Sequence, residues 1–349
     1  MPPPSSNSLF KSIHIASAIA FALLISFPIG SYGFTAKNVI DSPLLTQKIG
    51  TNRTIKVDIN GDGEFTSIQA AIDSVPEGNS QWVIVHVRKG IYREKVHVPS
   101  SKPYIFLRGN GKGRTSIVWS QSSVDNVESA VFKVEAKHFI AFGISFKNEA
   151  PTGVAYTSQN QSVAAFVAAD LVAFYHCGFY STHNTLFDYK GRHYYDSCYI
   201  QGSIDFIFGR GQSTFRSCEM FVIDDKRMKI HGSITAQNRE SANENSGFVF
   251  IKGKVYGIGG IYLGRAKGAY SRVIFANTYL SMTVVPAGWT NWSYHGSTEN
   301  LFHAEYDCHG PGAASGHRAP WAKQLTKDEV APFLDVSFID GSEWLPAWL

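Results

Sequence analysis

Short hydrophobic runs, separated by Gly, Asn and Ser, cover most of the chain after about residue 54. They are rich in Val, Ile, Phe and Tyr, the residues that strands favour. Examples are VIVHV (83–87), YIFLRG (104–109), SIVW (116–119), FIAFGISF (139–146) and FRSCEMFVI (215–223). No long helical period competes with these runs before the tail near residues 321–333. The pattern therefore predicts an all-β protein.

One short helix is expected near the start of this region. Thr66 is followed three residues later by Gln69, which is the spacing of a capping box. Hydrophobic residues follow with helical spacing at 68, 72 and 75, and Pro76 ends the pattern. Because strand-like sequence precedes and follows it, we expect a helix that caps the N-terminal end of a β structure.

Cysteines recur with a period near 20. Cys177, Cys198 and Cys218 are 21 and 20 residues apart, within the similar segments AFYHCGF, YYDSCYI and TFRSCEM. Ile144, in FGISF, extends the frame by 33 residues toward the N-terminus. Such a period, with about three short strands per repeat, is typical of a parallel β-helix. Residues one repeat apart then become neighbours about 4.8 Å apart in successive coils.

The cysteine ladder permits two interpretations. The thiols are either buried as small hydrophobic groups, or two stacked members form a disulfide, most plausibly Cys198 with Cys218. Cys308 has no partner in this frame. No CxxC or HxxxH spacing accompanies the cysteines, so no metal site is predicted.

The N-terminal sequence is organised like a secretory signal. Lys11 precedes the apolar stretch 13–27, and Pro28 with small residues follows it. The alternative is an uncleaved anchor, because the stretch is nearly long enough to span a membrane. We predict a signal peptide at 1–34, a short linker at 35–53 and one β domain at 54–349. The mature chain would be secreted, without membrane contact.

Glycosylation signals agree with a secretory route. N-x-S/T sequons begin at Asn52, Asn160 and Asn291, and they predict a glycoprotein. A glycan on Asn160 would obstruct the neighbouring Gln161, so we expect that sequon to be unoccupied.

The charge excludes some functions. The chain has 32 Lys and Arg against 28 Asp and Glu, a net charge of +4, without basic blocks. A nucleic-acid-binding arm and a polybasic membrane patch are therefore excluded as the main function. A mild positive charge is compatible with an acidic polymer as ligand.

A polar column is expected among the strands. Asp205 lies inside the apolar run GSIDFIFG (202–209), where a carboxylate needs a partner or a function. Asn184 stands 21 residues earlier, and Gln161 a further 23 residues earlier. Stacked coils would bring the three side chains onto one face, as a binding or catalytic groove or as a structural Asn/Gln ladder.

Several motifs resemble those of the plant-type pectin methylesterases, or pectinesterases, over residues 54–349. The matching segments are GIYRE (90–94), QSVAA (161–165), DFIFG (205–209), LGRAK (263–267), PAGWTNW (286–292) and EYDCHGPGA (305–313). The family's fold is a right-handed parallel β-helix, in agreement with the repeat. The resemblance implies a form without the inhibitor-like N-terminal pro-domain that many plant members carry.

The resemblance also implies a chemistry. Asp205 would attack the C6 methyl-ester carbonyl of pectin (methylesterified homogalacturonan), Arg265 would hold Asp205 in place, and Gln161 would stabilise the oxyanion. The products would be methanol and free carboxylates. No metal or organic cofactor is expected. Proteinaceous pectinesterase inhibitors are expected partners, nucleic acid is not, and the chain is expected to be a monomer.

The chain departs from the family's motifs at four positions. His183 and Asn184 replace the Gln and the acid/base Asp of QDTL, Lys267 replaces a subsite Trp, and Val131 stands for a substrate-contacting Thr. We expect Phe208 and Trp289 to contact sugar rings. The predicted substrate-binding residues are therefore the two aromatic residues, Phe208 and Trp289, together with Lys267 and Val131.

These departures leave two functions open. An amide cannot give up or take up a proton near neutral pH, so Asn184 favours a pectin-binding protein that has lost the chemistry. The intact pair Asp205 and Arg265 favours an active pectinesterase. His183 could transfer the proton, since a histidine titrates near pH 6.5. Neighbouring residues of a strand face opposite sides, however, which argues against His183 taking over from Asn184.

Overall fold

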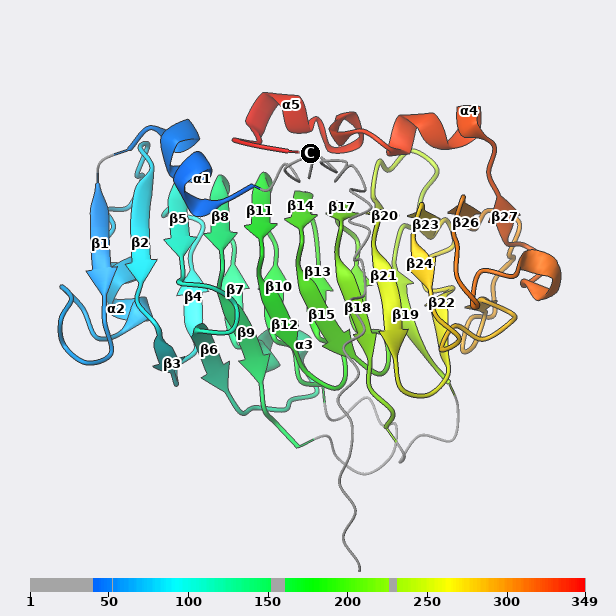
Figure 1. Ribbon diagram of the computed structural model, residues 1–349, viewed down its shortest axis with the longest axis horizontal. Coiled ribbons are helices and arrows are strands. Elements are labelled where there is room, and N and C mark those ends of the chain that lie inside the picture. The colour runs from blue at the N-terminus through cyan, green and yellow to red at the C-terminus, as the bar shows by residue number, and fades with distance from the viewer. Residues whose placement is uncertain (1–39, 52, 152–160, 226–230, 349) are drawn as a thin grey trace, which may run out of the picture. The chain divides into compact units, whose positions relative to one another are not determined.

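The computed structural model describes residues 40–51, 53–151, 161–225 and 231–348. Three sheets of parallel strands dominate these residues (Figure 1). Sheet A contains, in spatial order, β1 (Thr54–Val57), β2 (Val83–Val87), β5 (Ile105–Arg108), β8 (Phe139–Phe142), β11 (Val172–Tyr175), β14 (Arg192–Asp196), β17 (Gln212–Arg216), β20 (Gly247–Ile251), β23 (Arg272–Ala276), β26 (Phe302–Tyr306) and β27 (Lys323–Gln324).

The other two sheets have eight strands each. Sheet B contains β3 (Gly90–Tyr92), β6 (Thr115–Trp119), β9 (Ser145–Asn148), β12 (Gly178–Tyr180), β15 (Tyr199–Gly202), β18 (Glu219–Val222), β21 (Lys254–Gly257) and β24 (Tyr279–Leu280). Sheet C contains β4 (Val96–Val98), β7 (Phe132–Val134), β10 (Ala165–Val167), β13 (Leu186–Asp188), β16 (Ile207–Gly209), β19 (Gly232–Gln237), β22 (Ile261–Arg265) and β25 (Trp289–Thr290).

Helices are short and lie outside the sheets. They are α1 (Ser42–Ile49), α2 (Ile68–Asp73), α3 (Asn126–Ser129), α4 (Lys327–Val330) and α5 (Gly341–Trp344), with 3-10 turns η1 (Ser315–His317), η2 (Ala331–Phe333) and η3 (Val336–Ile339). Within the described ranges, no helix is long and apolar enough to cross a membrane.

Each coil contributes one strand to each sheet in turn. The strands β11, β12 and β13 form one coil, and β14, β15 and β16 form the next, paired in parallel with the first. This arrangement confirms the predicted parallel β-helix. Arg265 is the last residue of strand β22 in sheet C, and Asp205 lies two residues before strand β16 of the same sheet. Sheet C therefore positions the candidate site.

The cysteine frame marks the corner between sheets A and B. The residue before each cysteine of the ladder (His176, Ser197 and Ser217) has a positive φ of 52–53°. This left-handed conformation turns the chain sharply at the same place in successive coils. Cys308 also follows a residue with a positive φ, Asp307 at 46°. The two preceding coils carry Gly253 and Thr278 at the position that corresponds to Cys308.

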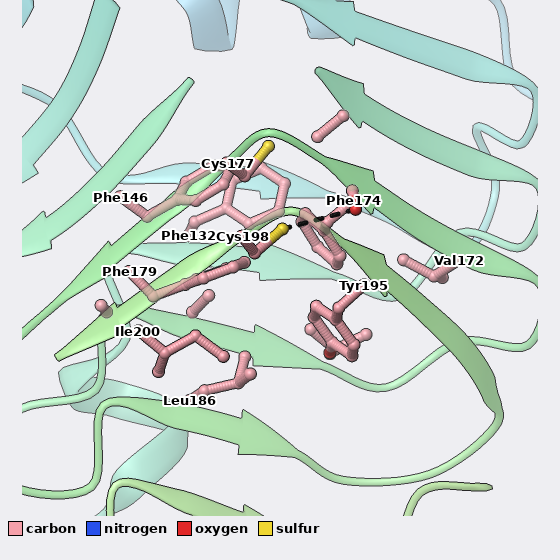
Figure 2. Packing of buried hydrophobic residues seen from close by; sticks show 14 of the residues in the cluster. Phe132, Phe146, Val172, Phe174, Cys177, Phe179, Leu186, Tyr195, Cys198 and Ile200 are labelled. Carbon is pink, nitrogen blue, oxygen red and sulfur yellow. Dashed lines mark hydrogen bonds between the residues drawn. The ribbon is translucent and has the colours of Figure 1, made fainter. Parts of the chain in front are cut away.

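Of the two interpretations of the cysteine ladder, the structure supports the buried thiols and not the disulfide between Cys198 and Cys218. All four cysteines lie in the described ranges, and each is a free thiol. The Cys198 thiol donates a hydrogen bond to the carbonyl of Phe174 at 3.4 Å (Figure 2), and the Cys218 thiol donates to that of Tyr195 at 3.5 Å. In-register neighbours lie about 4.8 Å apart with parallel side chains, whereas a disulfide brings the two Cβ atoms to about 3.8 Å. The ladder therefore packs as small hydrophobic groups.

Aromatic rings stack along the interior of sheet A. The ring centroids of Phe174 and Tyr195 are 5.2 Å apart, and those of Tyr195 and Phe215 are 4.5 Å apart, with interplanar angles of 4° and 5°. Phe250 and Phe275 continue the stack. One side chain per coil thus fills the same place in the core, as in-register parallel strands require.

Both ends of the described chain cover the outer face of sheet A. Leu45 of α1 and the C-terminal residues Val336, Ile339 and Leu345 belong to one buried cluster with outward-facing strand residues such as Tyr194. Figure 1 shows α1 and α5 on the same side of the stack. Sheet A is therefore buried on both faces, whereas sheet C keeps one face for a ligand.

The predicted N-terminal elements are partly revised. The capping helix is α2, but its N-cap is Ser67 rather than Thr66, because the Ser67 hydroxyl accepts the hydrogen bond from the amide of Ala70. The predicted linker includes helix α1. The predicted signal peptide and the sequons at Asn52 and Asn160 lie outside the described residues, and Asn291 is exposed.

Candidate active site

A cavity of about 760 Å³ opens over the outer face of sheet C. The residues predicted as catalytic all line it, and so do two of those predicted to bind substrate: Gln161, His183, Asn184, Asp205, Arg265, Phe208 and Lys267. Residues from four coils thus meet in one place.

The carboxylate of Asp205 is held by three donor groups. Asp205 lies two residues before strand β16, is 6% exposed and has a φ of 46°, which departs from the extended conformation of a strand. Its Oδ1 accepts hydrogen bonds from Ser233 Oγ at 2.6 Å and from Arg265 Nε at 2.8 Å. Its Oδ2 accepts from Arg265 Nη2 at 2.8 Å. A two-point contact of this kind fixes the orientation of both charged groups.

Arg265 reaches Asp205 across an intervening strand. The register places Phe208 beside Ala236 and Ala236 beside Arg265, so the small side chain of Ala236 leaves room for the guanidinium. The guanidinium carbon lies 5.3 Å from the ring centroid of Trp292, and Nη1 donates to Ser293 Oγ at 3.1 Å. The arginine is therefore clamped from both sides.

The polar column has a different composition from the one predicted. Asn184 and Asp205 are register neighbours, and both have positive φ, at 55° and 46°. The register opposite Asn184 belongs to Val163, however, and not to Gln161. Gln161 reaches the cavity through an antiparallel bridge with Ser123, in which each backbone amide donates to the other residue's carbonyl.

His183 and Asn184 both line the cavity, contrary to the alternation expected of a strand. The positive φ of Asn184 breaks that alternation. His183 Nε2 lies 3.0 Å from Asp225 Oδ2, and the two side chains are 12% and 5% exposed. Asn184 Nδ2 donates to Asn126 Oδ1 at 3.2 Å. An imidazole and an amide, from His183 and Asn184, thus lie next to the carboxylate of Asp205.

Aromatic rings form one wall of the cavity. Phe208 stacks on Phe187 with centroids 4.3 Å apart and an interplanar angle of 14°. Phe166 continues the row, and Tyr189 packs against the edge of Phe187 at 5.3 Å. Phe187, Tyr189 and Phe208 line the cavity and offer flat apolar surfaces for a ligand, whereas Phe166 is almost completely buried.

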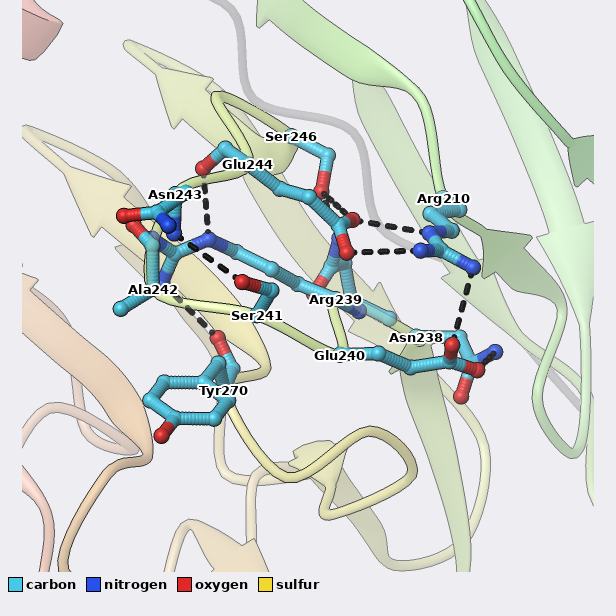
Figure 3. Close-up of polar contacts among 11 residues, drawn as sticks. Arg210, Asn238, Arg239, Glu240, Ser241, Ala242, Asn243, Glu244, Ser246 and Tyr270 are labelled. Atoms are coloured by element: carbon cyan, nitrogen blue, oxygen red, sulfur yellow. Dashed lines mark hydrogen bonds and ion pairs between the residues drawn. The ribbon is translucent and has the colours of Figure 1, made fainter.

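Charged groups stand at the rim. Arg210 donates two hydrogen bonds to Glu244, at 2.8 and 2.6 Å, and one to Glu240 at 3.0 Å (Figure 3). The hydrogen bonds to Glu244 raise the pKa of Arg210 further. Lys190 and Lys267 line the same cavity, and both are exposed. The rim therefore carries three basic side chains, of which Arg210 is already paired with two glutamates.

The comparisons with known proteins identify the family of the chain. Residues 54–342 match the family model described as Pectinesterase. The Arabidopsis thaliana protein named "Probable pectinesterase 67" is 71% identical over 313 residues, which are 90% of this chain and 91% of that protein. The chain belongs to the pectinesterase family. Pectinesterases are carboxylic ester hydrolases.

Solved pectinesterases share the fold. "Pectin methylesterase from Carrot" superimposes with a TM-score of 0.76 at 29% identity, covering 85% of this chain and 95% of that one. A pectin methylesterase in complex with a hexasaccharide gives a TM-score of 0.73 at 20% identity, covering 86% and 100% of the two chains. At that identity the second comparison supports the fold alone.

Two residues predicted to bind substrate lie in the core of the pectinesterase domain instead. Val131 is fully buried in the main hydrophobic cluster. Trp289 is 2% exposed, stacks on His303 with centroids 4.6 Å apart, and donates from Nε1 to Glu305 Oε1. Trp289 pairs with Gly264 and points inward, whereas Trp292 in the following loop lies against Arg265.

Several residues of the pectinesterase cavity were not predicted from the sequence. Asp225, Asn126, Tyr189 and Lys190 line it or contact its lining, and none belongs to a motif. The repeat of the coils could have indicated Tyr189, because it follows Phe187 by two residues and so faces the same side of the sheet. Within the described ranges, no group of three or more His, Cys, Asp or Glu side chains could hold a metal ion.

Proposed function

We propose that the chain is a secreted pectinesterase that hydrolyses the C6 methyl esters of homogalacturonan, with Asp205 as the nucleophile. The observation that carries the proposal is the carboxylate of Asp205 in the cavity, held by Arg265 and Ser233. A carboxylate fixed in this way is oriented before the ester arrives, so little reorganisation accompanies its attack.

The reaction would proceed in two stages. A carboxylate oxygen of Asp205 attacks the ester carbonyl carbon, and the carbonyl oxygen becomes an oxyanion. The side-chain amide of Gln161 would donate a hydrogen bond to that oxyanion. Methanol departs with a proton and leaves an acyl-enzyme, which water then hydrolyses to free carboxylate and restored Asp205.

The cavity suits a partly charged polysaccharide. The ring of Phe208, stacked on Phe187, supports the apolar face of a sugar. Lys267 and Lys190 would attract the free carboxylates of neighbouring galacturonate residues. We further propose that the protein acts in the cell wall as a monomer, with proteinaceous pectinesterase inhibitors as partners, and without a metal or organic cofactor.

A second function is favoured by Asn184. An amide at this position cannot protonate departing methanol or activate water. Loss of a general acid/base group typically reduces the rate by about 10²–10⁴. The alternative is therefore a pectin-binding protein that has kept the groove and lost the turnover.

The deciding experiment measures methanol release from highly methylated pectin by the purified secreted protein. We expect release by the wild type and none above background by Asp205→Asn, which preserves the shape of the side chain. Pectin binding by both proteins should be similar. A folded wild type that binds pectin and releases no methanol would establish the binding protein instead.

A further inference from the structure

We propose that His183, positioned by Asp225, is the group that transfers protons in this active site. The inference rests on the proposed function, because it assigns a step of the same hydrolysis. It names a donor and acceptor for the proton that Asn184 cannot carry. Asp225 acts through His183 and is a positioning residue.

The contact between the two side chains sets the state of the imidazole. Asp225 Oδ2 lies 3.0 Å from His183 Nε2, and both side chains are almost buried. A carboxylate accepts hydrogen bonds, so the Nε2 of the neutral ring carries the hydrogen. The other ring nitrogen, Nδ1, is then the atom that gains and loses the second proton. The carboxylate also stabilises the imidazolium when it forms.

The position of His183 places this exchange beside the nucleophile. His183 forms a bridge with Ile204, the residue before Asp205, in the adjacent coil. Neighbouring strands are about 4.8 Å apart, so a methyl ester attacked by Asp205 is also close to His183. Both residues line the same cavity, because the positive φ of Asn184 turns the chain there.

The proton and electron pairs balance over the two stages. In the first stage, Asp205 bonds to the carbonyl carbon, the bond to the methoxy oxygen breaks, and Nδ1–H of the imidazolium protonates that oxygen. Methanol and a neutral imidazole result. In the second stage, Nδ1 takes a proton from water as its oxygen bonds to the acyl carbon. The bond to Asp205 then breaks, which restores its carboxylate and the imidazolium and releases the product acid, which ionises in water.

Several charged groups share this environment and bear on any pH profile. Asp205, Arg265 and Lys267 line the cavity from the coils of β16 and β22, and Lys190, Arg210 and Glu240 line it from the rim. Asp225 also lines a second cavity of about 290 Å³, together with Asp224 and His231. The test therefore compares variants that change one group at a time.

The main test uses His183→Gln and the double variant His183→Gln/Asn184→Asp. We expect His183→Gln to lower kcat by about 10²–10⁴, with KM changed only a few-fold. The double variant supplies a carboxylate at the adjacent position and should recover to within about tenfold of wild type. That recovery would show that His183→Gln folds and has lost only the proton transfer.

The positioning role of Asp225 has its own readout. Without its carboxylate the imidazolium is less stable, so Asp225→Asn should lower kcat and move the limb of the kcat/KM profile that reports His183 to lower pH. A merely structural role would leave that limb in place. His97→Gln is the matched control, since His97 Nε2 also contacts a carboxylate, Glu135 at 2.6 Å, but on the exposed surface. It should behave as wild type.

The outcomes separate this inference from the proposed function. An unchanged kcat and pH profile in His183→Gln would overturn the role of His183 and leave Asp205 as the nucleophile. If the wild type were inactive and the double variant active, the role of His183 would also be overturned. Failure of the double variant to recover would assign His183 a structural role. Loss of activity in Asp205→Asn, with the expected His183 results, would support both proposals.

Discussion

At the scale of single residues, His303 shows how burial fixes a protonation state. Its Nδ1 accepts a hydrogen bond from Trp321 Nε1 at 3.2 Å, its Nε2 lies 3.1 Å from Ser271 Oγ, and its ring stacks on Trp289. Burial lowers the pKa of His303 to about 3, because no carboxylate compensates for the lost hydration. The neutral ring is therefore part of the native structure.

His303 should make the native state sensitive to acid. Its folded pKa lies below the unfolded value of about 6.5, so the unfolded chain takes up the proton first as the pH falls. This residue's contribution to the free energy of unfolding is fully present above pH 6.5 and is lost toward pH 3, by about 2 kcal/mol between pH 7 and 5. Urea denaturation at the two pH values measures the loss.

The matching variant is His303→Gln, whose amide can contact Ser271 and Trp321 but does not titrate. It should be less stable than wild type at pH 7, because it no longer stacks on Trp289. Between pH 7 and 5, its free energy of unfolding should fall by about 2 kcal/mol less than that of wild type. Parallel pH dependences of the two proteins would contradict the assignment.

Single residues were predictable where a motif or a physical cost marked them. Asp205 was marked as a carboxylate in an apolar strand, and Arg265 by its motif. The direction of Trp289 was not, because an aromatic residue at the end of a short strand suits either side. The positive φ of Asn184 also left no trace in the sequence, since Asn is common in many loop conformations. That angle is what brings His183 to the cavity.

At the scale of elements, helix α2 depends on a strand-to-strand loop. Glu94 accepts hydrogen bonds from the amides of Ile68 and Gln69, at 2.8 and 3.0 Å, and from the Ser67 hydroxyl at 2.7 Å. These are donors that the first turn of a helix cannot satisfy internally. The glutamate of the GIYRE motif is therefore a helix cap from a distant part of the sequence, and not a site residue.

Replacing Glu94 should destabilise the N-terminal end of the β-helix. Glu94→Gln keeps the shape and loses the charge, so we expect the free energy of unfolding to fall by about 1–3 kcal/mol. Urea denaturation at pH 7 gives the value. Glu135→Gln is the control, because Glu135 is exposed, and should change stability by less than about 0.5 kcal/mol. Equal effects of the two variants would count against the capping role.

Strands were easier to predict than helices for a physical reason. The period of the cysteine frame and the β-branched runs report the same repeated coil, so two signals agree for strands such as β11 and β14. Helices α1, α4 and α5 are short and depend on packing against sheet A, which no local pattern reveals. The N-cap was predicted at Thr66 and is Ser67, because both residue types can cap a helix. The choice between them depends on the contact with Glu94, which the local sequence does not reveal.

At the scale of the whole molecule, the fold holds without disulfides. The chain's four cysteines are free thiols. Burial raises the pKa of Cys177 and Cys218 well above the ordinary value, and raises the pKa of Cys308 to about 12. These three thiols are unreactive in this state, because the thiolate is the nucleophile. Cys198 is fully buried, so a reagent cannot reach it in the folded protein.

A thiol assay should therefore distinguish the folded and unfolded protein. We expect a disulfide reagent such as dithionitrobenzoate to react slowly with the native protein at pH 8. In concentrated guanidinium without reductant, it should titrate four thiols per chain. Reductant should leave the melting temperature unchanged. A count of two thiols would restore the disulfide between Cys198 and Cys218.

The architecture and the site were predictable, but the way the chain closes on itself was not. The repeat and the family motifs gave the β-helix and the residues that meet over sheet C. The hydroxyl of Tyr175 donates to the carbonyl of Ala347 at 2.8 Å, across 172 residues of sequence. Such contacts between the C-terminal segment and sheet A have no periodicity, so only the folded structure reveals them.

The reach of Arg265 has a consequence for heat inactivation. Each coil contacts mainly its neighbours, so a stack of this kind frays from its ends. Arg265 belongs to β22, which only β25 separates from the end of sheet C, whereas Asp205 lies two coils further in. Fraying from that end would withdraw the arginine while most coils stay intact. The protein would then lose the contact between Arg265 and Asp205 before it melts. The stability of the terminal coils, which contain the buried ion pair of Arg318 with Glu305, would limit the temperature at which that contact survives.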